Sequence, residues 1–410
     1  MSETRTHPAP APPVDAPRSR RGRPAGSYPA RVRAAAGRAW PALAAYALVR
    51  LVGVVAVALR AGEDGPSLGT LLASRFDTAW YLHIAQNGYT ELRPDSCVVQ
   101  GELCNYAFFP LYPGLVRGAS SLLPLPVGQV AWGISVTAAL LAAWGVYAVA
   151  RHVAGHRAGV IAAVLWGIVP HAVVESMAYT EPVFTALAAW SLYATLTRRW
   201  VAAGVLACLA GLTRPSGSAV VAAVVLAALW TLFSSRFGKR DRSVRPGPLL
   251  AAVAVAPLGW FAWFAWVGHR AGDWRGYFDV QEKWGSTFDG GSFTLHRIAD
   301  VFLKTPLNLN TAVGAATVIA ALVLFVVCVQ QRQPLVLLVY AGVLLLIAVG
   351  GAGYFHSKAR FLLPAFPLLI PMARALAAAR PATMYLLLAA ATLVSSVYGV
   401  HLMLVWKFSP

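Results

Sequence analysis

The chain has 410 residues, of which 58% are hydrophobic and only 12% are charged. Soluble domains contain about a quarter charged residues, so this composition excludes an ordinary globular protein. Apolar runs long enough to cross a bilayer recur along most of the chain, which predicts an all-α polytopic membrane protein. The net charge of +18 does not indicate nucleic-acid binding, because basic residues of membrane proteins collect in cytoplasmic loops.

Residues 1–38 are rich in Pro, Ala and Arg, and they predict a disordered, basic cytoplasmic tail. The pair Arg20–Arg21 could belong to a twin-arginine export signal. The apolar stretch that comes next is too long for such a signal, and more apolar stretches come after it. We therefore predict a tail followed by a transmembrane domain over residues 39–410.

The transmembrane domain contains about eleven candidate spans. The fifth and sixth are separated by TRPSG, residues 213–217, and could be two short helices or one broken helix. The candidate spans are 40–60, 126–150, 158–175, 181–197, 200–213, 216–233, 248–268, 309–330, 334–352, 361–379 and 381–404.

A cytoplasmic N-terminus places most arginines in short inner loops and most acidic residues outside, as the positive-inside rule requires. Three enlarged extracytoplasmic segments result, at about 61–125, 269–308 and 350–361. Many transporters show internal repeats and paired broken helices, and neither is visible in this sequence. Cys97 and Cys104 share the first of these segments, where they could form a disulfide or remain free thiols.

The first extracytoplasmic segment begins with RFDTAWYLHIAQNGY, residues 75–89. Read as a helix, it places Asp77 on the same face as Tyr81 and Ile84. Asp77 could cap the helix, or it could act as a general base at the membrane interface. The next stretch, NYAFFPLYPGLVR, suits a groove for a lipid chain. The candidate groove residues are Trp80, Tyr81, His83, Tyr106 and Phe109.

Other charged residues lie at the predicted outer ends of spans. Glu181 in AYTEPVF either complements the dipole of its helix or belongs to a site. Arg214 in TRPSG lies so close to hydrocarbon that it requires a partner. His356, Lys358 and Arg360 lie in HSKARFLL, where basic side chains could also simply reach toward the interface.

One acid and several bases on one side of the membrane suggest a phosphate site, because arginine and lysine hold phosphate and neutralise a leaving group. The sequence has no Asp-x-Asp pair and no cluster with metal-ligand spacing, so we expect no metal and no cofactor. A lipid-linked phosphate donor fits better than a sugar nucleotide. Aromatic and acidic residues alternate in 269–291, which is typical of sugar binding or of an interfacial aromatic belt.

These motifs together resemble the PIG-V family, the second mannosyltransferases of GPI-anchor assembly. FDTAWYLHIAQNGY and NYAFFPLYP are similar to its opening signature, and AYTEPVF is similar to its Ser/Thr–Glu stretch. AGLTRPSG resembles its Arg–Ser–Asn–Gly stretch, and KARFLLPAFPLL resembles its late Arg–Phe–Leu segment. Phe76, where the family has Trp, and Pro215–Ser216, where it has Ser–Asn, depart from the pattern.

The resemblance implies a GT-C glycosyltransferase fold with an extracytoplasmic active site and a polyprenyl-phosphate-mannose donor. Asp77 would be the catalytic base of an inverting transfer, and Glu181 would orient Asp77 or the acceptor. Arg214, His356, Lys358 and Arg360 would hold the donor phosphate. The Arg-, Ala- and Pro-rich composition suggests a high-GC bacterium, so we expect a plasma-membrane enzyme with a lipid, glycan or protein acceptor instead of a GPI precursor.

Two alternatives remain open from the sequence. The enzyme could use another lipid-linked sugar, because a few contacts in the folded pocket determine sugar specificity. The charged residues could instead line the path of a lipid or sugar transporter. The sequence does not indicate whether the protein has a protein partner.

Overall fold

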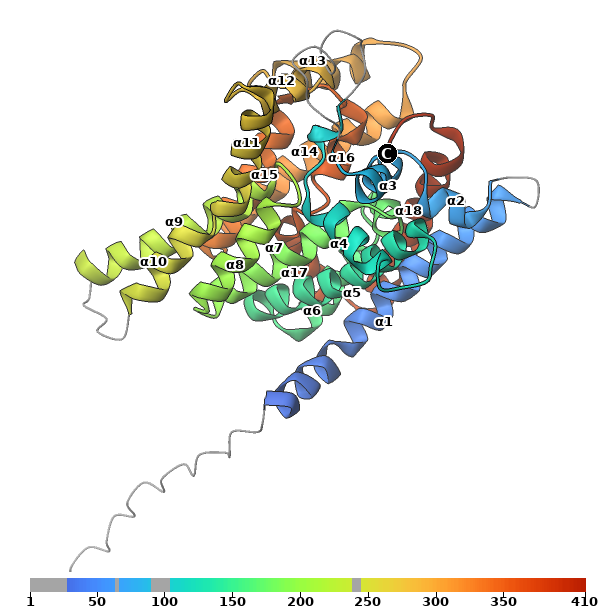
Figure 1. The fold of residues 1–410 in the computed structure, drawn as a ribbon. Coiled ribbons are helices and arrows are strands. Elements are labelled where there is room, and N and C mark those ends of the chain that lie inside the picture. The colour runs from blue at the N-terminus through green and yellow to red at the C-terminus, as the bar shows by residue number, and fades with distance from the viewer. Residues whose placement is uncertain (1–27, 63–65, 90–103, 238–244) are drawn as a thin grey trace, which may run out of the picture. The chain divides into compact units, whose positions relative to one another are not determined.

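The computed structural model describes residues 28–62, 66–89, 104–237 and 245–410, with side chains over 33–62, 66–89, 104–235 and 245–410. The chain divides into two units, Met1–Arg38 and Ala39–Pro410. Of the first unit only the start of helix α1 is described. The second unit contains the remaining helices and all of the candidate site residues (Figure 1).

Helices make up almost all of the regular structure that is described. The longer ones are α1 (Tyr28–Ala61), α5 (Val127–Ala154), α6 (His156–Trp166), α7 (Thr180–Leu196), α8 (Trp200–Gly211), α9 (Gly217–Phe237), α10 (Pro246–Val255), α11 (Leu258–Ala271), α14 (Leu309–Gln330), α15 (Leu335–Gly350), α17 (Ile370–Ala378) and α18 (Pro381–Val400). The shorter elements are α2 (Leu68–Ala73), α3 (Asp77–Asn87), η1 (Asn105–Ala107), α4 (Leu111–Ser120), η2 (Ala172–Ser176), α12 (Gly276–Lys283), β1 (Thr287–Phe288), α13 (Ser292–Leu303), β2 (Gly351–Ala352), η3 (Phe355–Ser357), α16 (Lys358–Phe361), η4 (Phe366–Leu369) and η5 (His401–Val405).

Six helices within the described ranges are long and apolar enough to cross a membrane. A seventh span results if the segment Phe355–Ala378, bent by 77°, is counted as one crossing. Each of the about eleven predicted spans contains helix, but that at 158–175 is α-helical only to Trp166, because Gly167 and Pro170 interrupt it. The chain is therefore a multi-pass membrane protein, and the number eleven stays a prediction.

The TRPSG segment joins two separate helices, which decides the alternative that the sequence left open. α8 ends at Gly211 and α9 begins at Gly217. A Cβ atom on Gly217 would lie 2.6 Å from the Cα atom of Gly211, so the two helix ends touch through their backbones. This close turn places Arg214 between the two helix ends.

Small residues allow the neighbouring helices to pack closely, as is usual between membrane helices. A Cβ atom on Gly145 of α5 would lie 2.7 Å from the Cβ atom of Ala189 on α7. A Cβ atom on Gly204 of α8 would lie 2.9 Å from the Cα atom of Ala252 on α10. α5, α7, α8 and α10 thus form a tight scaffold that supports the charged residues at the start of α7 and after α8.

A polar cluster anchors α1 to the turns that follow α6. The hydroxyl of Tyr46 donates to Glu175 at 2.9 Å. Arg50 donates to the Ser176 hydroxyl at 3.0 and 3.1 Å and to the Gly167 carbonyl at 2.9 Å. Both charged side chains of the cluster are buried, so each depends on these partners.

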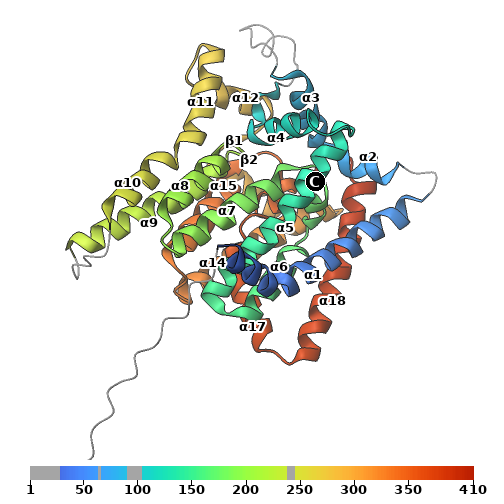
Figure 2. The ribbon, with the colours of Figure 1, turned by 60° about the horizontal axis from the view of Figure 1, so that its bottom comes forward.

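The shorter helices collect at one end of the long helices. In Figure 2, α3, α4 and α12 lie together near one end of α11. The antiparallel pair β1–β2 matches Thr287 with Ala352 and connects the segment after α12 to the end of α15. The amides of Phe293 and Gly291 donate to the Asp289 carboxylate, and they hold its pKa below the usual range.

The packing of Gly204 against Ala252 leads to a stability prediction. Gly204→Ala places a methyl group against the α10 backbone and should lower the free energy of unfolding by about 1–3 kcal/mol. Gly247→Ala is the control, since a Cβ atom on Gly247 meets nothing within 4 Å. Thermal unfolding in detergent should show a lower midpoint for Gly204→Ala alone. Equal midpoints for the two variants would contradict this packing.

Candidate functional site

Asp77 begins α3 directly after a residue with unusual backbone geometry. Phe76 has φ of 60°, a left-handed conformation that is uncommon for a bulky residue. The backbone amide of Asp77 donates to the Tyr179 hydroxyl at 3.2 Å. Phe76 occupies the N-cap position, and no side chain caps the helix there. The Asp77 carboxylate is therefore not used for capping.

The Asp77 carboxylate instead contacts Arg360, which α16 supplies from far along the chain. Arg360 Nη1 lies 2.7 Å from Asp77 Oδ2. The same guanidinium approaches Glu181, with 3.5 Å between Nε and Oε1. Arg360 thus joins the start of α3 to the first turn of α7.

Arg214 completes this group from the turn between α8 and α9. Its Nη1 atom lies 2.5 Å from Glu181 Oε1 and donates to Thr180 Oγ1 at 2.9 Å. The partner that the sequence required for Arg214 is therefore Glu181. The four residues Asp77, Arg360, Glu181 and Arg214 form a continuous charge network, with two acids and two bases in alternation.

Burial within the charge network is uneven. The Glu181 side chain is 1% exposed and that of Arg360 is 8% exposed, whereas Arg214 and Asp77 retain 14% and 23%. Two guanidinium groups flank the buried Glu181, so its charge is compensated. Asp77 has a single ion-pair partner in the described structure and is the most accessible member. An entering anion would therefore compete with Asp77 for Arg360.

Lys358 and His356 lie close in sequence to Arg360 but have other contacts. Lys358 is 2% exposed, and its ammonium donates to the carbonyls of Ala348 and Gly351 at 2.5 and 2.6 Å, at the end of α15. The ring of His356 packs against Trp406, with 5.3 Å between ring centroids. Within the described ranges, no hydrogen bond or ion pair joins either side chain to the charge network.

Three of the predicted groove residues lie on α3. Tyr81 is buried, and its hydroxyl is 3.2 Å from Thr180 Oγ1, beside the charge network. Trp80 stacks on Phe108 at 5.7 Å between ring centroids. His83 is exposed and is 3.2 Å from the Asn87 amide nitrogen. Tyr81 alone of these three thus lies against the charged residues.

The other two predicted groove residues fill an aromatic core. Tyr106 and Phe109 are 0% and 2% exposed. Phe109 packs on Trp263 and Tyr277, at 5.6 and 5.7 Å between ring centroids. The described structure therefore shows no open groove at these two residues.

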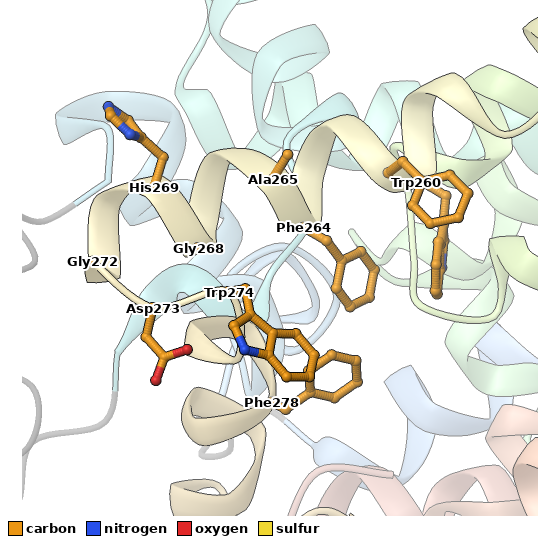
Figure 3. A pocket seen from close by; sticks show the side chains of 10 residues that line it. Trp260, Phe264, Ala265, Gly268, His269, Gly272, Asp273, Trp274 and Phe278 are labelled. Atoms are coloured by element: carbon orange, nitrogen blue, oxygen red, sulfur yellow. The ribbon is translucent and has the colours of Figure 1, made fainter.

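An open groove runs along α11 and the turn into α12 (Figure 3). Its volume is about 790 Å³. Trp274 and Phe278 lie on one side, Phe264 points toward them, and His269 points away. The lining residues are Trp260, Phe261, Phe264, Ala265, Gly268, His269, Gly272, Asp273, Trp274 and Phe278.

One end of the groove reaches the turn between α8 and α9. The indole N–H of Trp260 donates to the carbonyl of Pro215 at 3.0 Å, one residue after Arg214. Phe264 also packs on Tyr277 of the aromatic core, with 4.4 Å between ring centroids. An apolar path thus leads from the segment 269–278 to the turn that carries Arg214.

Two of the sequence predictions concern a disulfide and a metal. Cys97 belongs to residues 90–103, outside the described residues, so the Cys97–Cys104 bridge stays a prediction. No group of three or more His, Cys, Asp or Glu side chains in the described part of the chain could hold a metal ion. Metal-independent chemistry also stays a prediction.

Three residues near the charge network were not predicted from sequence. Tyr179 and Thr180 precede Glu181 in AYTEPVF, and their polar side chains beside a buried acid were the available signal. Ser409 donates to or accepts from the Tyr179 hydroxyl at 3.1 Å and accepts from Arg360 at 2.9 Å. Its sequence position, far from every motif, offered no signal.

Two solved structures share this fold over most of this chain. ArnT of Cupriavidus metallidurans, bound to undecaprenyl phosphate, superimposes with a TM-score of 0.50 at 17% identity, over 84% of this chain and 62% of ArnT. The apo oligosaccharyltransferase of Archaeoglobus fulgidus gives a TM-score of 0.52 at 15% identity, over 90% of this chain and 56% of that one. At such identities the likeness establishes the fold alone.

Sequence comparison adds a partial match. Residues 118–266 match the family described as dolichyl-phosphate-mannose-protein mannosyltransferase. The matched part includes Glu181 and Arg214 but neither Asp77 nor Arg360. No curated protein matches the chain. The chain spans less than two thirds of both solved structures named above.

The central position of Glu181 leads to a second prediction. Glu181→Gln leaves Arg214 without its carboxylate partner and leaves Arg360 with Asp77 alone, so it should lower the free energy of unfolding by about 3–5 kcal/mol. Asp300→Asn is the control, because its ion pair with Lys304, at the end of α13, is much more exposed than Glu181. Thermal unfolding in detergent should separate the two variants clearly. A Glu181→Gln midpoint equal to that of the control would contradict the stabilising role of Glu181.

Proposed function

We propose that this protein is an inverting glycosyltransferase that uses a polyprenyl-phosphate-linked sugar as donor and an extracytoplasmic hydroxyl as acceptor. One observation carries the proposal. A partly exposed carboxylate, Asp77, lies beside a buried guanidinium, Arg360, in a chain whose fold resembles that of ArnT. This pair supplies both functions that the reaction requires, a base for the hydroxyl and a cation for the phosphate.

Before the donor binds, Arg360 is paired with Asp77. When the donor binds, Arg360 contacts its phosphate. The phosphodiester carries a negative charge and competes with the Asp77 carboxylate for Arg360 Nη1. Arg214 contributes a second positive charge, while Glu181 keeps both guanidinium groups fixed. Donor binding would thereby release the Asp77 carboxylate for its role as base.

The chemical step then proceeds in one displacement. Asp77 accepts the proton of the acceptor hydroxyl, and the acceptor oxygen forms a bond to the anomeric carbon of the sugar. The bond from that carbon to the phosphate oxygen breaks, and its electrons leave with polyprenyl phosphate. The leaving phosphate gains negative charge, which Arg360 and Arg214 stabilise more strongly than they stabilise the donor.

Mannose is the sugar that we propose. The partial match to the dolichyl-phosphate-mannose-protein mannosyltransferase family and the resemblance to the PIG-V family both favour it. The ArnT structure contains undecaprenyl phosphate, which favours a polyprenyl phosphate as the carrier. The proposed location is a bacterial plasma membrane, with a cytoplasmic N-terminus and an extracytoplasmic site.

The contacts of Lys358 and His356 favour supporting roles in this scheme. Lys358 caps the carbonyl end of α15, where a cation is favourable, and so fixes the start of α16 below Arg360. His356 packs against Trp406 and Phe408. We therefore propose that Arg360 and Arg214 are the main residues that bind the donor phosphate.

We propose that the isoprenoid chain of the donor binds in the groove along α11. It is lined mainly by aromatic side chains, and its Trp260 end contacts Pro215, the residue after Arg214. If Arg214 and Arg360 bind the phosphate, the isoprenoid chain attached to it would enter the groove at its Trp260 end. Burial of each isoprenoid unit against Phe264 and Phe278 would then add to donor affinity.

The base assignment is tested with Asp77→Asn. Loss of the carboxylate should lower turnover with polyprenyl-phosphate mannose by about 10²–10⁴-fold, the usual contribution of a general base. Transfer of radiolabelled mannose by membranes measures this, and Asp300→Asn serves as the control. A folded Asp77→Asn protein with full turnover would exclude Asp77 as the base.

The groove assignment is tested with Trp274→Ala, whose parent side chain is 80% exposed and so contributes little to folding. The variant should raise the KM about tenfold for a long-chain donor, in line with the loss of one large apolar contact. The KM for a two-unit isoprenoid donor should not change. Trp40→Ala, an exposed tryptophan of α1, is the matched control. Equal effects on both donors would place the chain elsewhere.

A further inference from the structure

The chain returns to the charge network after its last helix. α18 continues into η5, a turn of π-helix over His401–Val405, and the backbone then runs to the start of α3, where the last residue is found (Figure 1). Trp406 and Phe408 pack on each other at 5.2 Å between ring centroids, and both pack on His356. Arg75 donates to the carbonyl of Met403. These contacts fix the segment Trp406–Ser409 against the site.

Ser409 closes a ring of hydrogen bonds around Asp77 and Arg360. Arg360 Nη1 donates both to Asp77 Oδ2, at 2.7 Å, and to Ser409 Oγ, at 2.9 Å. Ser409 Oγ is 3.1 Å from the Tyr179 hydroxyl. That hydroxyl accepts a hydrogen bond from the backbone amide of Asp77 at 3.2 Å. These hydrogen bonds thus form a closed ring that connects the carboxylate of Asp77 to its own backbone amide.

We propose that Ser409 is a positioning residue of the transferase, which holds Arg360 in the orientation that stabilises the leaving phosphate. This inference rests on the proposed function. Arg360 Nη1 has two hydrogens, and one of them stays on Ser409 when the other moves from Asp77 to the phosphate. The guanidinium therefore keeps a fixed anchor during the exchange.

The ring also controls the backbone at Asp77. Phe76 holds a left-handed conformation that a bulky residue seldom adopts without support. The Tyr179 hydroxyl supports the next amide, and Ser409 orients that hydroxyl. Ser409 therefore acts on both partners, Arg360 directly and Asp77 through Tyr179.

The leaving group gains charge only as the glycosidic bond to phosphate breaks, so Ser409 should affect turnover more than donor binding. Ser409→Ala should lower kcat about tenfold, as expected for one hydrogen bond to a charged group. The KM for the donor should change less than threefold. Ser409→Thr keeps the hydroxyl and should retain at least half of the activity. Ser396→Ala is the control, since that hydroxyl donates to the Thr392 carbonyl within α18, away from the charge network.

A binding measurement separates this inference from the proposed function. Farnesyl phosphate, a phosphomonoester like the leaving group, should bind about tenfold more weakly to Ser409→Ala than to the wild type. Binding is measured by calorimetry on the full-length protein and requires no transfer. If wild type binds farnesyl phosphate but transfers no sugar, the proposed function fails while the positioning role is still tested.

Two results would overturn the inference. One is unchanged kcat and unchanged farnesyl phosphate affinity in Ser409→Ala. The other is a loss that Ser409→Thr does not restore and that accompanies a lower unfolding midpoint, because a residue that only ties down the segment would behave in this way.

Discussion

The site depends on the cost of placing a charge where water is scarce. Glu181 is almost completely buried, and its carboxylate is tolerable there only because Arg214 and Arg360 lie on either side. Those contacts bring together α7, the turn between α8 and α9, and α16. Asp77 is then added at the exposed end of the network, where its single ion pair can be exchanged for a contact to an incoming anion. Charge compensation thus both builds the site and leaves one carboxylate available.

The scaffold fixes these positions through close helix packing. Gly204 allows α8 to contact the backbone of α10, and Gly217 allows α9 to begin directly beside the end of α8. The turn between α8 and α9 has little freedom as a result, and Arg214 is held where Glu181 requires it. The same turn contacts Trp260, which opens the aromatic groove. Packing, the charge network and the groove are therefore parts of one arrangement.

Sequence reasoning identified the four members of the charge network because charges are rare and expensive in apolar segments. It could not separate Arg360 from Lys358, two residues earlier. Residues two apart do not share a helix face, and the structure directs Lys358 to the end of α15. The predicted groove at Tyr106 and Phe109 is filled by aromatic packing, and the open groove along α11 lies next to it. Ser409 reaches Tyr179 from 230 residues away, and no local pattern encodes such a contact.

The fate of the donor tests the central claim most directly. Proteoliposomes containing the protein, polyprenyl-phosphate mannose and a bacterial membrane extract as acceptor source should be followed by mass spectrometry. The account predicts that free polyprenyl phosphate appears together with an equal amount of mannosylated acceptor of inverted anomeric configuration. Donor that crosses the bilayer intact, with no polyprenyl phosphate released, would contradict the account and would favour a transporter.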